Sequence, residues 1–357
     1  MAPAHTQVFE DAITISPLSS HTYSANLRDE WCIGAVPHGG YTTCVLARLA
    51  KTHFAHTHPN LSTSPATPIS VQLSFLRRTD VGPALLTVED MKIGARTSTI
   101  HVLLKQRSKS KNEEEVKVAG YITLSPAAAE TGITAKTSWT LHPPPPPGSS
   151  GPVNLRALAA KGRDGNWIRI PAPFVQFRRA AANVELYGPD PASFSPETNA
   201  SRRAIVDQWA RFRPLGSDKK LLEGRWTDDT IGFLVDMFPM MLDGFDVIST
   251  AAQDPTLATK GKSQGKTPRG TFWYPTVTLN VDYKKRLPAE GVEWLYCRVQ
   301  TKAVKNGRTD IDVTVLDESG EIVALATQVG LVVSASRNLA GRDLKKVKVD
   351  AQGKANL

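Results

Sequence analysis

Five consecutive prolines, Pro143 to Pro147, constrain the fold of this 357-residue chain more than any other feature. Because proline has no backbone amide hydrogen, the run fits neither a helix interior nor a central strand, and we expect an extended polyproline segment. The stretches before and after the run show the same order of predicted elements. This repeat predicts two similar units joined by an irregular connection.

Each predicted unit begins with one helix and continues with four strands. Apolar residues recur at helical spacing over Tyr41 to Ala50, directly after a Gly-Gly pair, and a second helix is expected over Thr230 to Leu242. The predicted strands cover residues 71–78, 84–91, 97–105 and 116–124 in the first half and 276–283, 292–302, 310–316 and 322–333 in the second. Short turns between them imply antiparallel hairpins, so the pattern favours an α+β fold over a doubly wound parallel sheet.

The composition is that of an ordinary globular protein, with 41% hydrophobic and 22% charged residues. Three cysteines without CxxC spacing are too few for a disulfide framework, so we expect a reducing compartment. No apolar run approaches the roughly 20 residues of a membrane span, and no signal peptide pattern is present. The net charge of +9 gathers in Arg107 to Lys111 and in a basic tail, both predicted to be flexible, so no nucleic-acid partner is expected.

Several short motifs occur in a fixed order in the two halves. The first half has Val36-Pro37-His38-Gly39-Gly40-Tyr41 at the helix start, Ser74-Phe75-Leu76-Arg77-Arg78 at a strand end, and Gly94-x-x-x-Ser98. The second half has Asp236 on the helix, Thr278-Leu279-Asn280 in the strand that leads to Arg286 and Pro288, and Ala326-Thr327-Gln328-x-Gly330. With these motifs the chain resembles the double-hotdog acyl-CoA thioesterases of type II, and more closely the fungal thioesterase-like proteins, over residues 25–125 and 203–335.

The resemblance implies a tandem (double) hotdog, in which two antiparallel sheets are each wrapped around a central helix. We expect an N-terminal hotdog in residues 1–125, a Pro-rich irregular linker in 126–165, a C-terminal hotdog in 166–336 and a basic tail in 337–357. The implied activity is the hydrolysis of acyl thioesters, with acyl-CoA or an acyl-carrier thioester as substrate and without a cofactor or metal. A homo-oligomer is also compatible with the family.

The family orients and activates water with an Asp, a Thr or Ser, and a Gln, and the matching catalytic residues here are Asp236, Thr278 and Gln328. Asp236 is conspicuous without the family, because a carboxylate in a hydrophobic helix is costly unless it is paired or used. Its alternative role is to hold backbone amides or an arginine. Gln328 shares a small-residue face with Ala324 and Ala326, although it could simply bond within the sheet. Thr278 is preferred to Thr276 because only Thr278 gives the family's gapless spacing to Pro288.

The start of the first helix is the expected site of substrate and oxyanion binding, with His38, Gly39, Gly40 and Tyr41 as its residues. Exposed amides at a positive helix end suit a thioester oxygen, and two glycines allow close approach. A glycine pair can also be only a turn. Because the first helix has no carboxylate that matches Asp236, we expect one complete site per chain, shared between the halves.

Two other functions remain open. A hotdog lyase, dehydratase or cyclase acting on a polyketide-like acyl chain would need a histidine paired with an aspartate, and His38 has no such partner close to it in the sequence. The second is a non-catalytic acyl-binding protein. No GxSxG, P-loop or GxGxxG motif supports serine hydrolase, NTPase or dinucleotide chemistry.

Two further motifs are weaker. His53, His56 and His58 lie in an expected Thr- and Pro-rich loop, Thr52 to Pro68, without a carboxylate or cysteine nearby, so no metal site is predicted. The chain ends Lys354-Ala355-Asn356-Leu357, which resembles a variant of the SKL-type peroxisomal signal. The expected location is therefore peroxisomal or cytoplasmic.

Overall fold

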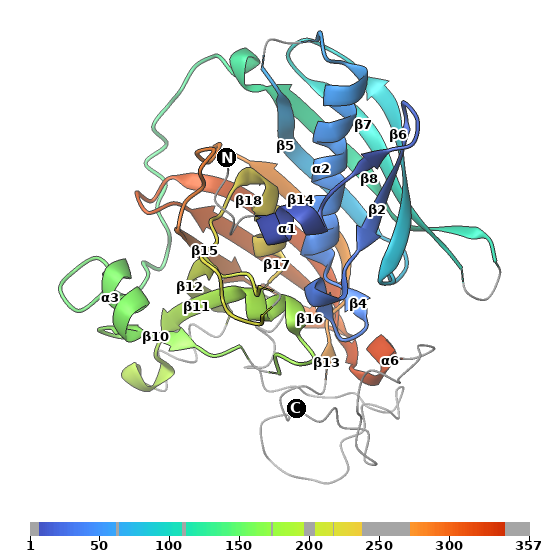
Figure 1. The fold of residues 1–357 in the computed structure, drawn as a ribbon. Coiled ribbons are helices and arrows are strands. Elements are labelled where there is room, and N and C mark those ends of the chain that lie inside the picture. Colours follow the sequence, from blue (N-terminus) through green and yellow to red (C-terminus); the bar gives the residue numbers. More distant parts are fainter. Residues whose placement is uncertain are drawn as a thin grey trace.

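An antiparallel sheet of 15 strands forms the frame of the protein in the computed structural model (Figure 1). The structure describes residues 7–61, 64–108, 112–172, 174–195, 204–216, 218–237 and 272–339. Together with a few helices, this sheet makes the protein an α+β protein, as the hairpin pattern predicts.

The strands of the first half come first along the sheet: β1 (Ser16–Pro17), β2 (Thr22–Leu27), β6 (Gly82–Lys92), β7 (Ser98–Arg107), β8 (Glu114–Pro126) and β5 (Ala66–Phe75). The strands of the second half follow: β14 (Thr276–Tyr283), β18 (Ile322–Leu331), β17 (Arg308–Leu316), β15 (Trp294–Gln300), β12 (Ile205–Phe212), β11 (Val184–Pro189), β10 (Trp167–Ile170) and β9 (Arg163–Asp164), with β16 (Val304–Lys305) beside β17. Two small pairs lie outside the sheet, β3 (Cys32–Ile33) with β4 (Val36–Pro37) and β13 (Phe272–Trp273) with β19 (Val333–Ser334). The helices are α1 (Gln7–Ala12), α2 (Gly39–Thr57), α3 (Leu155–Lys161), α5 (Ile231–Val235) and α6 (Ser336–Leu339).

Each of the eight strands predicted from the sequence is present, and the strands of the two halves join edge to edge. Strand β5 of the first half pairs with β14 of the second, from Ser74↔Thr278 to Ser70↔Asp282. Both strands would otherwise be edges with unpaired backbone groups, and pairing them satisfies those groups. The two halves therefore share one continuous sheet.

Helix α2 lies against the strands of the first half and is buried nearly all round (Figure 1). Its apolar side chains extend on several sides, as expected for a helix that is covered on every face. Around its first turns an aromatic cluster joins the halves, because Trp31 packs against Tyr41 and against Phe212 and Phe233 of the second half. This cluster brings the start of α2 next to α5.

The second predicted helix is much shorter than expected within the described residues. Helix α5 ends at Val235, and Asp236 follows as its C-terminal cap residue. The rest of the predicted helix, from residue 238 to Leu242, lies outside the described residues. Asp236 is thus placed at a helix end, where its carboxylate can leave the helix and meet groups from other elements.

The connection between the halves is anchored by side chains of the second half. The indole of Trp167 donates to the carbonyl of Pro146 over 2.9 Å, and Arg298 Nη1 donates to that of Pro143 over 2.6 Å. The expected irregular stretch also contains α3 and β9. Most of the basic tail, from residue 340 to Leu357 with its terminal signal-like sequence, lies outside the described residues. No helix among the described residues is long and apolar enough to cross a bilayer.

Candidate active site

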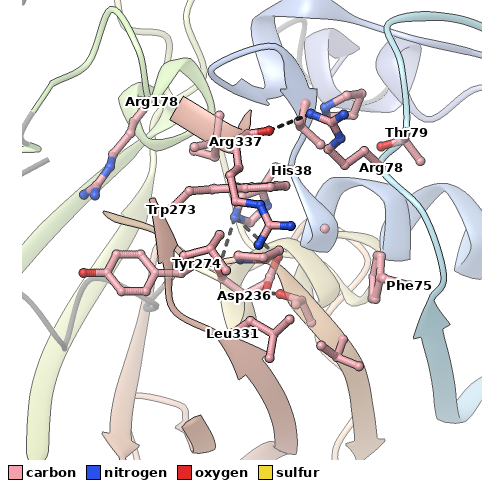
Figure 2. Close-up of a pocket in the computed structure, with 18 of the residues that line it drawn as sticks. His38, Phe75, Arg78, Thr79, Arg178, Asp236, Trp273, Tyr274, Leu331 and Arg337 are labelled. Carbon is pink, nitrogen blue, oxygen red and sulfur yellow. Dashed lines mark hydrogen bonds and ion pairs between the residues drawn. The ribbon is translucent and has the colours of Figure 1, made fainter. Parts of the chain in front are cut away.

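A cavity of about 610 Å³ lies where the start of α2 meets the end of α5 (Figure 2). Its walls are mostly apolar and aromatic, with side chains from several strands and loops: Ile33, Val36, Phe75, Leu76, Phe177, Met237, Phe272, Trp273, Tyr274, Val277, Leu331 and Val333. Its polar lining includes His38 and Asp236, from opposite halves of the chain. A concave, apolar cavity with a few convergent polar groups is the usual form of a small-molecule site.

Asp236 is 3% exposed, and both of its carboxylate oxygens accept hydrogen bonds. Oδ2 accepts from the backbone amide of Gly40 over 2.6 Å, and Oδ1 accepts from the hydroxyl of Thr276 over 3.0 Å. The carboxylate thereby occupies the positive N-terminal end of α2. These donors replace the water that a buried carboxylate loses.

His38 precedes α2 and contacts Asp236 in two ways (Figure 2). Its Nε2 lies 3.0 Å from the carbonyl oxygen of Asp236 and 3.5 Å from Oδ2. A carbonyl only accepts, so Nε2 carries the proton and Nδ1 keeps a lone pair. Nδ1 is buried and has no hydrogen-bond partner among the described residues.

The His38 ring is neutral at neutral pH. Its burial lowers the pKa of His38 below the ordinary value of 6.5, and the charge and carbonyl of Asp236 oppose this only in part. The histidine and the aspartate stand 198 positions apart in the chain. Folding thus supplies the acidic partner that His38 lacks in the nearby sequence.

The two glycines allow α2 and α5 to approach each other closely. A Cβ on Gly39 would lie 2.7 Å from Asp236 Oδ2, and one on Gly40 would lie 2.5 Å from the backbone oxygen of Gly232. Gly39 also lines the cavity, and as the first residue of α2 its amide has no acceptor within the helix. The amide of Gly40 already donates to Asp236. Of the two amides, that of Gly39 is therefore the one left for a ligand.

Thr276, and not Thr278, meets Asp236. A bulge interrupts the register between β14 and β18 at Thr276 and Thr278, so the usual alternation of side chains is broken there. Beyond the bulge, Thr278 pairs with the exposed Val329. It lies on the same face of β14 as the exposed Asn280 and Asp282. The prediction that Thr278 faces the site is wrong because sequence spacing does not show the bulge.

Gln328 lies on the buried, small-residue face of β18, as predicted. Its Nε2 donates to the carbonyl of Val235 over 2.9 Å, one residue before Asp236. This bond holds the end of α5 and so positions the carboxylate. Gln328 does not belong to the cavity lining.

Tyr41 lies in the core and not in the cavity, which corrects its predicted place in the substrate site. Its side chain is fully buried among Phe9 and Trp31, and its hydroxyl donates to the carbonyl of Ala12 over 2.7 Å. The phenol oxygen also accepts from the amide of Arg28 over 3.2 Å. The spacing of α2 explains why the Tyr41 side chain points into the core, since Tyr41 lies on the same helix face as the buried Val45 and Leu49.

Arginines make the lining of the cavity basic, a feature that the sequence pattern does not reveal. Arg77, Arg78, Arg178 and Arg337 line it, and Asp236 is the only acidic residue among the described lining residues. Arg77 is paired with Glu115 over 2.9 Å, and Arg78 donates to the backbone carbonyl of Arg337 over 2.6 Å. In Figure 2 the exposed side chain of Arg337 reaches toward His38. An anionic ligand would find a favourable potential here.

Two domain profiles match most of the chain. The acyl-CoA thioesterase N-terminal domain matches residues 27–125, and the acyl-CoA thioesterase C-terminal domain matches residues 152–332. The Thioesterase-like protein TwmA of Talaromyces wortmannii is 32% identical to this chain over 354 residues, covering 93% of each chain. The N-terminal profile thus matches the first half of this chain, and the C-terminal profile matches the second half.

Solved structures show the same fold at low sequence identity. A thioesterase II from Thermobifida fusca superposes with a TM-score of 0.61 at 17% identity, over 93% of this chain and 100% of its own. A protein with a hot dog fold from Alicyclobacillus acidocaldarius also gives 0.61, at 16% identity, over 92% of this chain and 98% of its own. An acyl-CoA thioesterase II from Mycobacterium marinum gives 0.55 at 14% identity, over 92% and 99%.

Proposed function

Because this chain belongs to the acyl-CoA thioesterase family, and is an acyl-CoA thioesterase-like hydrolase, we propose that the cavity between α2 and α5 hydrolyses acyl thioesters. The observation that carries this proposal is the buried Asp236 carboxylate, which is held by Gly40 and Thr276 beside an apolar cavity. A carboxylate fixed in this way can orient and deprotonate a water molecule without reorganising.

The proposed reaction begins with a water molecule bound at Asp236. Each carboxylate oxygen has two lone pairs, so the bonds from Gly40 and Thr276 leave room for the water. Its oxygen attacks the thioester carbon while its proton passes to Asp236, and the amide of Gly39 stabilises the oxyanion. The intermediate then collapses with cleavage of the C–S bond. The leaving thiolate takes the proton from Asp236, giving the free acid and the thiol.

The neighbours of Asp236 have positioning roles in this proposal. Thr276 and Gly40 fix the carboxylate, and Gln328 fixes the helix end that carries it. Neutral His38 donates to the Asp236 carbonyl and fixes the same residue from the first half. The catalytic residue is Asp236, and Thr278 and Tyr41 have no part.

The lining of the cavity suggests how a substrate would lie. The aromatic and aliphatic walls suit an acyl chain, and the four lining arginines suit a thiol carrier that bears phosphate groups, as coenzyme A or an acyl-carrier protein does. Apolar walls and basic residues in one cavity thus match the two ends of an acyl thioester.

A panel of acyl-CoA thioesters of increasing chain length, assayed for free thiol, tests the proposal. We expect thiol release with a preference for some chain lengths, and equal amounts of free acid. Phosphopantetheine and carrier-protein thioesters of the best acyl group then compare the carriers. Absence of thiol release from every thioester would contradict the proposal.

The contact between His38 and Asp236 supports a second candidate, a lyase or dehydratase acting on a 3-hydroxyacyl thioester. Such chemistry needs a histidine and an aspartate in one site, and these two side chains lie 3.5 Å apart. The same panel distinguishes the candidates, because dehydration gives an enoyl thioester and water without free thiol. Thiol release from acyl-CoA without a 3-hydroxyl group would favour hydrolysis.

We also propose that the fold is a tandem hotdog with the division expected from the sequence, namely 1–125, 126–165, 166–336 and 337–357. In support, α2 packs on strands of the first half, and the N-terminal domain profile ends at residue 125, where the linker is proposed to begin. The C-terminal profile begins at residue 152, inside the proposed linker.

A further inference from the structure

At the opposite end of α2 from the cavity, three histidines surround one aspartate. His21 precedes β2, His53 and His58 stand at the C-terminal end of α2, and Asp90 lies on β6. The expected loop from Thr52 is wrong in its first part, because α2 continues to Thr57, and the sequence shows no carboxylate near His53 or His58. The structure supplies Asp90, which is 37 positions from His53.

The ring nitrogens of these histidines converge on the two Asp90 oxygens. His53 Nε2 lies 2.9 Å from Oδ1, while His58 Nε2 and His21 Nε2 lie 3.0 Å and 3.4 Å from Oδ2. His21, His53 and Asp90 offer ligand atoms that all lie within 4.8 Å of one another. Three groups of this kind at this spacing can close on one ion with small side-chain rotations.

Hydrogen bonds around His53 hold its ring so that Nε2 faces Asp90. The hydroxyl of Tyr23 donates to the carbonyl of Ser20 over 2.7 Å, so its oxygen accepts from His53 Nδ1 at 2.9 Å. Thr57 lies 3.3 Å from Nε2, but its hydroxyl donates to the carbonyl of His53 over 2.7 Å. Tyr23 thus takes up Nδ1, and Nε2 is the ring nitrogen of His53 that faces Asp90 Oδ1, at 2.9 Å.

The residue types in this cluster suit a metal ion. Imidazoles and one carboxylate are the ligands that a divalent transition metal prefers. His21 Nδ1 also lies 2.9 Å from the hydroxyl of Ser20. The rings of His21 and His53 thus each have a hydrogen-bond partner at Nδ1, as metal-bound histidines usually do at the nitrogen that does not bind the metal.

The surroundings favour a cation and allow it to enter. The C-terminal end of α2 carries the negative end of the helix dipole. The side chain of His53 is fully buried, which fixes one ligand, whereas that of His21 is 46% exposed and faces solvent. A site with a buried anchor and an exposed ligand has both rigidity and an entry path.

We propose that His21, His53 and Asp90, with His58 beside them, bind one divalent transition-metal ion such as Zn²⁺. The ion joins β2, α2 and β6. Because His53 lies 14 residues after Gly39 in α2, the ion lies about 21 Å along the helix from the cavity, at about 1.5 Å per residue. Its role is therefore structural, and it takes no part in thioester hydrolysis.

Calorimetric titration of chelator-treated protein with ZnCl₂ tests this site. We expect one ion per chain, proton release on binding, and a higher melting temperature with zinc. The variants His21→Ala and Asp90→Asn should bind at least about tenfold more weakly. The matched control is His56→Ala, because His56 belongs to the same motif and packs edge-on against Tyr23 without lying in the metal trio.

Unaltered zinc affinity in His56→Ala together with weaker binding in His21→Ala would support the site. Absence of stoichiometric binding in the wild type would overturn it, as would equal losses in His21→Ala and His56→Ala. If Asp90→Asn does not fold, the half-exposed His21 decides the outcome, since its truncation leaves the core intact. These readouts do not depend on thioesterase activity.

Discussion

The Asp236 carboxylate, at the end of α5 in the second half, accepts a 2.6 Å hydrogen bond from the backbone amide of Gly40 at the start of α2 in the first half. An acid from one half thus caps the central helix of the other. Both the close packing of the helices and the orientation of the carboxylate depend on this contact. The candidate site therefore forms only when the two halves fold together.

Replacing Thr276 by valine should reduce thioester turnover by about 10- to 150-fold, because a hydrogen bond to a charged group is worth roughly 1.5–3 kcal/mol. Thr276→Val removes the hydroxyl that donates to Asp236 Oδ1. The matched control is Thr278→Val, two residues along the same strand but on the other face. Steady-state thiol release compares the two. A larger loss in Thr278→Val would contradict the placement of Thr276 at the site.

The stability of the protein should fall as the pH drops below about 6.5, in part because of His38. Burial lowers the pKa of His38, so below its ordinary value of 6.5 the unfolded chain takes up a proton that the folded chain does not. The free energy of unfolding then decreases by up to about 1.4 kcal/mol per pH unit for this group, until folded His38 is itself protonated. The pKa of His53 is also lowered by burial and adds to the effect.

Denaturant titrations between pH 5 and pH 7.5 measure this dependence, in the wild type and in His38→Gln. Glutamine can still donate to the Asp236 carbonyl but does not titrate. The variant should therefore show a shallower loss of stability on the acid side. An identical pH dependence in both proteins would mean that His38 is not held neutral.

Removing Arg298 should destabilise the protein by about 3–5 kcal/mol, the usual cost of leaving a buried charge unpaired. Arg298 and Asp207 are fully buried and joined by bonds of 2.7 Å and 3.0 Å, and Arg298 also holds the carbonyl of Pro143. Arg308→Met, an exposed arginine on β17, is the control and should change stability by less than about 0.5 kcal/mol. Equal effects of Arg298→Met and Arg308→Met on the denaturation midpoint would contradict this.

The sequence predicts the parts of the fold that have a local pattern. Helix α2 and the eight predicted strands have apolar periodicity and clear turn residues. Strand β12 was not predicted because its buried Asp207 and Gln208 interrupt the apolar alternation. The pairing of β5 with β14 was also not predicted, since edge-to-edge pairing between the halves has no local signal.

The candidate site shows the same division between local and long-range features. Asp236, Gly39 and Gln328 can be picked out by chemistry and spacing, and the structure brings them to the same region. The choice between Thr276 and Thr278 depends on a bulge, which shifts the side-chain alternation by one residue. The partners of His38 and His53 could not be predicted, because both contacts join distant segments.

The central claim is that Asp236 activates water for thioester hydrolysis, and the turnover of Asp236→Asn tests it most directly. Asparagine keeps the size of the side chain and an oxygen that can accept from Gly40, while its amide can donate to Thr276 after the hydroxyl rotates. Circular dichroism and the melting temperature should show an intact fold. Thiol release from the best acyl-CoA should fall by roughly 10²–10⁴. A folded Asp236→Asn variant with wild-type turnover would contradict the claim.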